Sequence, residues 1–119
     1  MKNLYDEWQM SPAIICNGFA FLTGFNGASL QGIVSHDPET QMLEAFQQVE
    51  MVLKAGSMGF EHVVEMTSYH VGLRDHLALL RSVRSRFVVE PYPAWTAIDV
   101  AGFATERVII ELRAIAKLP

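Results

Sequence analysis

The C-terminal segment 107–116 constrains the fold most, because its side chains alternate in character along a predicted β-strand. Successive side chains of a strand point to opposite faces of the sheet. One face carries only apolar side chains, those of Val108, Ile110, Leu112, Ala114 and Ala116. The other carries two isoleucines among three charged residues, namely Arg107, Ile109, Glu111, Arg113 and Ile115. The first face belongs against helices, and nothing in the remainder of the chain is left to cover the second.

Local signals place a hairpin and a helix in the first half of the chain. Asn17-Gly18 separates two apolar runs, 13–16 and 19–23, and this dipeptide favours the two positive φ angles of a type I′ turn. The glycines that follow predict an irregular loop through His36. Asp37-Pro38 is a helix-start signal. The helix should end at Ala55-Gly56, with one face formed by Met42, Phe46, Val49 and Leu53.

The second half predicts a strand over 62–71, a helix over 73–87, and strands over 95–100 and 107–116. The buried stripe of the helix should be Leu73, Leu77, Leu80 and Val83, with the arginines on its other faces. The element order is therefore β-β-α-β-α-β-β. It predicts one α+β domain over residues 1–119, a two-layer sandwich with both helices on one face of a mixed sheet.

Composition adds a prediction of self-association. Half of the 119 residues are hydrophobic and 18% are charged, which is apolar for a domain with so large a surface relative to its volume. A homo-oligomer in which sheets pack face to face around a symmetry axis would bury the isoleucines of the mixed face. The alternative is an open sheet that faces solvent on one side, which antiparallel sheets tolerate.

Other partners are disfavoured. The net charge is −4, and Arg74, Arg81, Arg84 and Arg86 lie along the predicted helix without interleaved aromatics, which indicates a solvated face rather than a nucleic-acid site. No apolar run approaches the ~20 residues that span a bilayer, and the N-terminus lacks a signal-peptide segment, so a cytoplasmic location is expected. Cys16 should be a buried structural thiol. The histidines show no metal-ligand spacing, and neither a metal nor a cofactor is predicted.

Three segments together resemble the RidA/YjgF family of reactive-intermediate deaminases. They are Ser11-Pro12-Ala13 leading into NGFAFLTG at 17–24, PAWTAIDV at 93–100, and VIIELRAIA at 108–116. The last two have the order and spacing of the family's C-terminal signature, and the order of the predicted elements matches as well. The resemblance covers the chain from about Ser11 onward.

This resemblance implies a chorismate-mutase-like fold and a homotrimer whose sheets form an inner barrel, with small-molecule pockets in the clefts between subunits. The well-known activity of the family is hydrolysis of enamines and imines such as 2-iminobutanoate and 2-iminopropanoate, and one branch deaminates 2-aminomuconate. Some relatives carry endoribonuclease or translation-inhibitor labels. The acidic charge of this chain and its missing basic stripe argue against such a role.

The chain departs from the family at the residue after Pro-Ala, where the family's enzymes carry an arginine that holds the substrate carboxylate. Trp95 stands there, and its single N–H and lack of charge cannot form a two-pronged hydrogen bond. A family cysteine and a helix asparagine are Ala97 and Leu80 here. The aromatic expected near Met10 is missing, although Trp8 is close. The chain therefore looks like a divergent subgroup that lacks the catalytic arginine.

Two positions match the family's pocket. Gly24 corresponds to a glycine whose backbone lines the pocket, and Glu111 to the acid that positions the attacking water. Glu111 and Arg113 share a strand face, so they form either a structural salt bridge or an acid/base with a relocated grip on a carboxylate. Trp95 either fills the volume vacated by the arginine or stacks on a ligand.

These residues predict a homotrimer that binds a small metabolite in intersubunit clefts and has weak or no activity on 2-iminobutanoate and 2-iminopropanoate. The alternative is an active deaminase of a different enamine or imine, such as an aminomuconate-like compound, with Glu111 as its acid/base.

Overall fold

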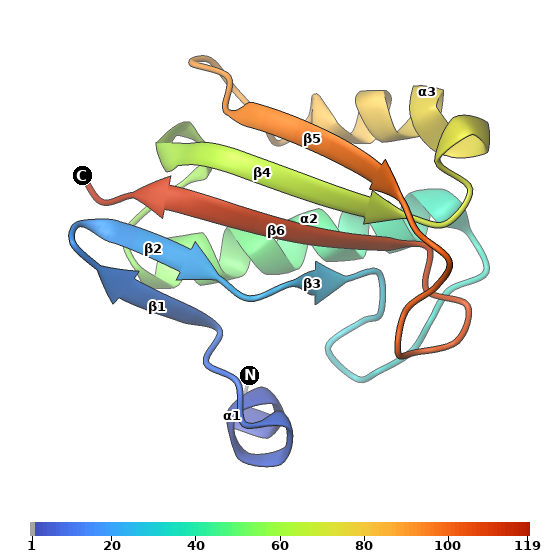
Figure 1. Cartoon of the computed structure of the whole chain (residues 1–119), viewed down its shortest axis with the longest axis horizontal. Coiled ribbons are helices and arrows are strands. Elements are labelled where there is room, and N and C mark those ends of the chain that lie inside the picture. Colours follow the sequence, from blue (N-terminus) through green and yellow to red (C-terminus); the bar gives the residue numbers. More distant parts are fainter. Residues whose placement is uncertain (1) are drawn as a thin grey trace.

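A computed structural model describes residues 2–119 and folds them into a six-stranded sheet with two long helices on one face (Figure 1). The helices are α1 (Lys2–Trp8), α2 (Pro38–Ala55) and α3 (Leu73–Arg84), with a 3₁₀ turn, η1 (Phe60–His62). The strands are β1 (Ala13–Cys16), β2 (Phe19–Leu22), β3 (Phe25–Asn26), β4 (Val63–His70), β5 (Ala94–Asp99) and β6 (Ile110–Lys117). The predicted α+β class and two-layer arrangement are confirmed.

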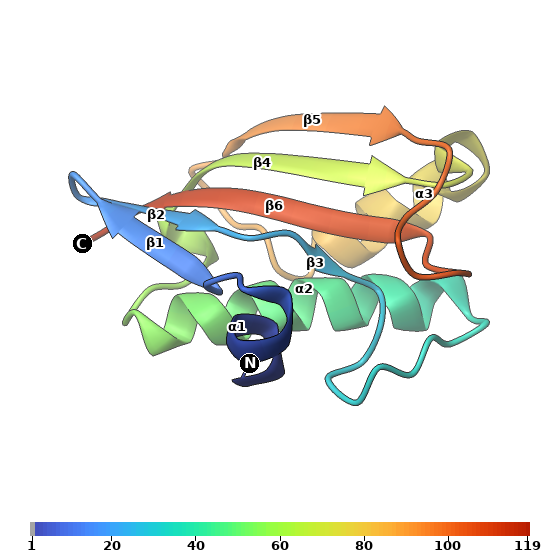
Figure 2. The same cartoon turned by 60° about the horizontal axis from the view of Figure 1, so that its bottom comes forward.

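The last strand, β6, lies in the middle of the sheet. The strand order is β1-β2-β6-β4-β5, and β3 also pairs with β6. Only β4 and β5 run parallel. The face of β6 that was predicted to pack on helices is buried, from Val108 through Ala116. Figure 2 shows α2 running beneath the sheet on this side. Burial of this one face of β6 against α2 therefore anchors the two layers.

The opposite face of the sheet is covered by neither α2 nor α3, and we call it the open face (Figure 1). The strand registers place the following side chains on it: Ile14, Phe21, Glu65, Thr67, Tyr69, Ile98, Glu111, Arg113 and Ile115. Ile14 and Phe21 are exposed here although they are apolar. The mixed character predicted for one strand therefore extends across the whole sheet.

The local signals of the first half are confirmed in detail. Asn17 and Gly18 have φ angles of 52° and 79°, as a type I′ turn requires. The side chain of Asp37 accepts a hydrogen bond of 3.1 Å from the backbone N–H of Thr40, which caps α2, and Pro38 begins the helix. The apolar stripe of α2, from Met42 to Leu53, is buried.

The second long helix differs from its prediction in length and in its buried face. α3 ends at Arg84 rather than at residue 87. Leu77, expected in the buried stripe, is 42% exposed, because α3 lies along the β5 edge of the sheet and is covered only in part. Arg84, expected on a solvated face, is half-buried instead.

Other differences concern short or irregular segments. Neither α1 nor the two-residue strand β3 was predicted from the sequence. β6 begins at Ile110 rather than at residue 107, because Arg107 has a φ of 69° and therefore cannot continue an extended strand. Cys16, expected to be buried, is exposed. It lies beside the hairpin turn on the edge strand β1, which has a neighbour on one side only.

One buried side chain joins the loops that flank α2 and β6. The amide nitrogen of Gln41 donates hydrogen bonds of 2.8 Å to the carbonyl oxygens of both Ser35 and Arg107. Its amide oxygen accepts a bond of 2.9 Å from the N–H of Ile109. The single glutamine thus satisfies three backbone groups from two distant parts of the chain, and it fixes residues 107–109, which lead into β6. Among the described residues, no helix has the length and hydropathy needed to cross a membrane.

His70, at the end of β4, is a buried titratable group. Its side chain is 1% exposed, and its Nε2 atom has no hydrogen-bond partner among the described residues. Burial lowers the pKa of His70 to about 4 from 6.5, which the charge of Asp99 opposes and that of His76 assists. The folded protein therefore holds this imidazole neutral at pH values where the unfolded chain protonates it.

We expect the free energy of unfolding to fall as the pH drops from 6.5 toward 4, because the unfolded state then binds a proton that the folded state excludes. Between pH 7 and pH 5 this linkage amounts to about 2 kcal/mol. Urea unfolding of the native protein and of His70→Gln at both pH values measures the difference. The variant should lose less stability on acidification, whereas His36→Gln, at an exposed position, should behave like the native protein. Equal losses in all three proteins would contradict the assignment.

Candidate functional site

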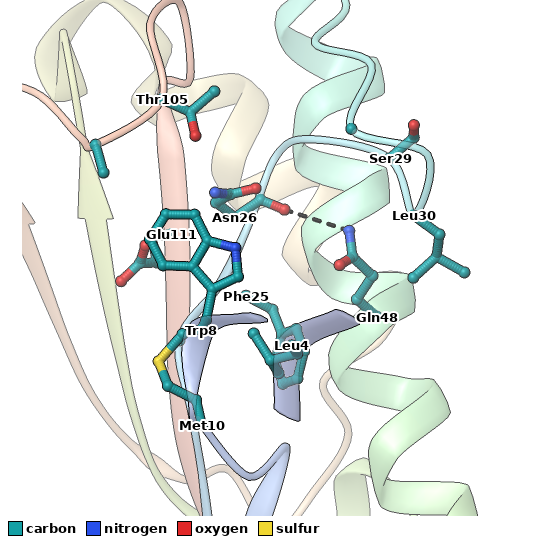
Figure 3. A pocket seen from close by; sticks show the side chains of 13 residues that line it. Leu4, Trp8, Met10, Phe25, Asn26, Ser29, Leu30, Gln48, Thr105 and Glu111 are labelled. Atoms are coloured by element: carbon teal, nitrogen blue, oxygen red, sulfur yellow. Dashed lines mark hydrogen bonds between the residues drawn. The ribbon is translucent and has the colours of Figure 1, made fainter. Parts of the chain in front are cut away.

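A pocket of about 340 Å³ lies at the β3 side of the sheet, between the N-terminal segment, β3 with its following loop, and α2 (Figure 3). Its lining comes from five parts of the chain: Leu4, Trp8, Met10, Gly24, Phe25, Asn26, Ser29, Leu30, Gly32, Gln48, Ala104, Thr105 and Glu111. We call it the Trp8–Glu111 pocket. Among the described residues of this lining, Glu111 is the only one with an acidic or basic side chain.

Glu111 projects from the open face of β6, where its Cα pairs with that of Asn26 on β3. The side chain is half-buried, and this burial raises the pKa of its carboxyl group. In the described part of the chain, Glu111 forms no ion pair, and in particular none with Arg113. A carboxyl group in this state can give or take a proton closer to neutral pH than an exposed one.

Gly24 allows the Glu111 carboxylate to lie where it does. A Cβ atom at this position would lie 2.5 Å from Oε2 of Glu111 and 2.9 Å from its carboxyl carbon. The absence of a side chain on this backbone therefore leaves space for the acid. Gly24 and Glu111, which were matched to the family separately, are in contact.

The N-terminal helix supplies the aromatic side chain of the pocket. Trp8 ends α1, and Gln9, with a φ of 55°, turns the chain so that Met10 also reaches the lining. Figure 3 shows the indole of Trp8 beside Glu111 and Met10. Trp8 is 64% exposed, so one side of its ring faces solvent. The pocket therefore has an aromatic side chain, that of Trp8 at the end of α1, although Met10 itself is not aromatic.

A polar network holds the opposite wall. The amide nitrogen of Gln48, on α2, donates hydrogen bonds to the carbonyl oxygens of Ala28 (2.6 Å) and Asn26 (3.4 Å). The side-chain oxygen of Asn26 accepts a bond of 2.9 Å from the N–H of Ala28. These bonds fix the loop that follows β3 against α2. This role of Gln48 and Asn26 was not predicted. Asn26 follows Gly24 by two positions, but Gln48 is 24 positions away, and no sequence signal connects it to the pocket.

Trp95 lies on the other side of the sheet. In the parallel pairing of β4 and β5 its Cα is beside that of Met66, which is buried under the helices, whereas Glu111 is beside Tyr69 on the open face. The indole N–H of Trp95 donates a hydrogen bond of 2.9 Å to Oγ of Ser68. Within one chain, Trp95 therefore does not reach the Trp8–Glu111 pocket.

The remaining positions from the sequence analysis are also dispersed. Leu80 is fully buried in the core under α3, and Ala97 is half-buried on the helix-covered side of β5. Arg113 is exposed on the open face. Of the residues singled out from the sequence, one chain thus brings together Gly24 and Glu111, with Trp8 beside them.

Residues 2–118 match the family model described as Endoribonuclease L-PSP. The RutC family protein YjgH of Escherichia coli is 30% identical over 121 residues, which cover 98% of this chain and 88% of YjgH.

Solved structures agree with the sequence match. A structure of protein YJGH matches with a TM-score of 0.87 at 29% identity, and the match covers 98% of this chain and 88% of the YJGH chain. The structure of E. coli TdcF with bound serine has a TM-score of 0.83 at 20% identity, with 92% and 88% covered, and shows the common fold. The chain therefore belongs to the Endoribonuclease L-PSP family, which confirms the resemblance to the RidA/YjgF proteins seen in its sequence.

Proposed function

We propose that this protein is a cytoplasmic homotrimer that binds a small metabolite at the Trp8–Glu111 pocket and hydrolyses 2-iminopropanoate weakly or not at all. One observation carries the proposal: the pocket joins a carboxyl group of raised pKa to an indole, but the part of its lining that the structure describes contains no lysine or arginine. Its volume of about 340 Å³ suits a ligand the size of an amino acid. The relative TdcF has been solved with serine bound, and serine is a ligand of that size.

The missing cation bears on catalysis because it removes the usual hold on the substrate. Hydrolysis of an imine needs an acid/base group, a water molecule and a group that holds the substrate in place. Glu111 can supply the first. The family resemblance assigns the third to an arginine at the position of Trp95, and loss of such a paired contact costs on the order of 2–5 kcal/mol. This corresponds to a rate roughly 30- to several-thousand-fold lower.

The raised pKa of Glu111 also favours a second candidate, a deaminase acting on a different enamine or imine, such as an aminomuconate-like compound. A substrate with an extended conjugated system could be held by the indole of Trp8, without an arginine. Both candidates use the same pocket and differ in whether Glu111 transfers a proton during turnover.

The open face supports the homotrimer. It combines Ile14, Phe21, Ile98 and Ile115 with Glu65 and Arg113, and neither α2 nor α3 covers it in a single chain. Packing three such sheets around an axis would bury the apolar side chains and would let the opposite charges pair between subunits. We propose that the same assembly brings β5 of one subunit close to the Trp8–Glu111 pocket of the next.

An assay with enzymatically generated 2-iminopropanoate separates the two candidates. We expect turnover near the uncatalysed rate for the native protein, and an increase of at least about 30-fold in Trp95→Arg, if arginine restores the missing grip. Glu50→Gln removes a charge from a surface pair with Lys54 on α2 and serves as the control for Glu111→Gln. Strong native turnover that is lost in Glu111→Gln but kept in Glu50→Gln would overturn the proposal in favour of an active deaminase.

Replacing Gly24 by alanine tests the contact with Glu111. The added Cβ must displace the carboxylate, whose end is flexible, so the cost in stability should be only about 0.5–1.5 kcal/mol. The pKa of Glu111, followed by the ¹³C signal of its carboxyl carbon, should change. Gly102→Ala adds a Cβ with no atom within 4 Å and should leave this pKa unaltered. An unchanged titration in Gly24→Ala would show that the glycine does not hold the acid in place.

Native mass spectrometry tests the assembly. The chain has a mass of 13.3 kDa, so a trimer should appear at roughly 40 kDa, three times that value. Ile98→Lys places a charge on the open face and should shift the population toward monomer. Met51→Lys changes a side chain of similar exposure on α2 (39% against 41%) and should leave the trimer intact. A native monomer at micromolar concentration would refute the homotrimer.

A further inference from the structure

The last residue of α3, Arg84, is held by an aromatic ring rather than by an acid. Its guanidinium carbon lies 4.2 Å from the centroid of the Trp95 ring, over the face of the indole. Such cation–π contacts are attractive, and the attraction is larger where water is partly excluded. The ring itself is fixed, because its N–H is bound to Ser68 on the neighbouring strand. Arg84 therefore lies on a platform whose orientation is already set.

The hydrogen-bonding capacity of Arg84 is not used up by this arrangement. Its Nε atom is buried and has no partner among the described residues, and no carboxylate there forms an ion pair with the guanidinium. Arg86, two residues later, instead pairs with Glu39 at 3.1 Å. Arg107 donates to the carbonyl oxygen of Val34. A buried donor without an acceptor is unfavourable, but Nε has too little exposed surface to reach a ligand itself. The terminal nitrogens of the same guanidinium, which form no ion pair among the described residues, are the donors that can meet an acceptor.

The electrostatic surroundings of Arg84 point the same way. Burial lowers its pKa, which means that its positive charge has lost part of its hydration, and only the phenol of Tyr92 opposes this change. Guanidinium is planar, and its N–H groups form a fork that matches the two oxygens of a carboxylate. The ring contact is made at the guanidinium carbon, so the two terminal nitrogens can still bind such a group.

We propose that Arg84, supported by Trp95, binds the carboxylate group of a small organic acid. In this arrangement Trp95 holds the arginine rather than the ligand, and the arginine supplies the charge that tryptophan lacks. The site is built by one chain, on the helix-covered side of the sheet, and does not require the assembly or the pocket proposed above.

Two-dimensional ¹⁵N NMR of the intact protein tests the site, because the chain has only two tryptophans and they lie in different places. Trp8→Phe assigns the two indole N–H signals. Propionate, added at constant ionic strength, should shift the Trp95 indole signal and the Arg84 Nε–H signal saturably, and the Trp8 signal should stay in place. Propionamide, a neutral molecule of the same shape, should shift neither.

Substitutions of Arg84 separate the contribution of its forked N–H geometry from that of its positive charge. Arg84→Gln should weaken the propionate response at least 10-fold, and Arg84→Lys, which keeps the charge but loses the fork, should weaken it to an intermediate extent. Arg74→Gln removes an exposed arginine from the other end of α3 and should change the affinity less than twofold. If Arg84→Gln does not fold, Arg84→Lys and the propionamide comparison still decide the question.

Four results would overturn the proposal. Three of them are an equal response to propionamide, a propionate response that survives in Arg84→Gln, and binding of sulfate as tight as that of propionate, which would indicate a general anion site. Shifts at Trp8 alone would place propionate in the Trp8–Glu111 pocket, and would therefore count against Arg84 but not against the proposed function.

Discussion

The two-sidedness of β6 is the constraint on which the other features depend. Ile110 and Leu112 are fully buried beneath the sheet, and Glu111, between them in sequence, must therefore face the opposite side. A register shift of one residue would exchange these positions and place a carboxylate in the core. The packing energy of the apolar side chains thus also determines where the acid of the pocket lies. Because β6 pairs with β2, β3 and β4, the same register positions Gly24 beside that acid.

Much of the fold was predictable because its signals are local. The Asn17-Gly18 turn, the Asp37-Pro38 helix start and the alternation along β6 each depend on residues within a few positions of one another. The strand β3 has only two residues, which are too few for a periodic pattern. It exists through its pairing with β6, in which Asn26 lies beside Glu111, 85 positions later in the chain. The start of β6 at Ile110 was not predicted for a similar reason, since the left-handed conformation of Arg107 has no sequence signal.

The site was predictable in part. The family resemblance identified Gly24 and Glu111, and the structure shows them in contact. The environment of Trp95 could not be predicted from the sequence. It depends on the parallel register of β4 and β5 and on which face of α3 turns toward β5. The arginines of α3 were predicted to lie on its other faces, but Arg84 follows Leu80 by four positions and therefore continues the apolar stripe. Its guanidinium lies over an aromatic ring eleven positions later in the sequence.

The bridge formed by Gln41 has a consequence for the conditions under which the loops around β6 stay ordered. Its three hydrogen bonds join an amide to backbone groups, and none of these partners titrates or carries a net charge. Acid that protonates His70, or salt that screens the ion pair of Arg86, leaves this junction unaffected. The loop segments at Ser35 and at Arg107–Ile109 should therefore be among the last parts of the molecule to lose their order when the pH falls or the salt concentration rises.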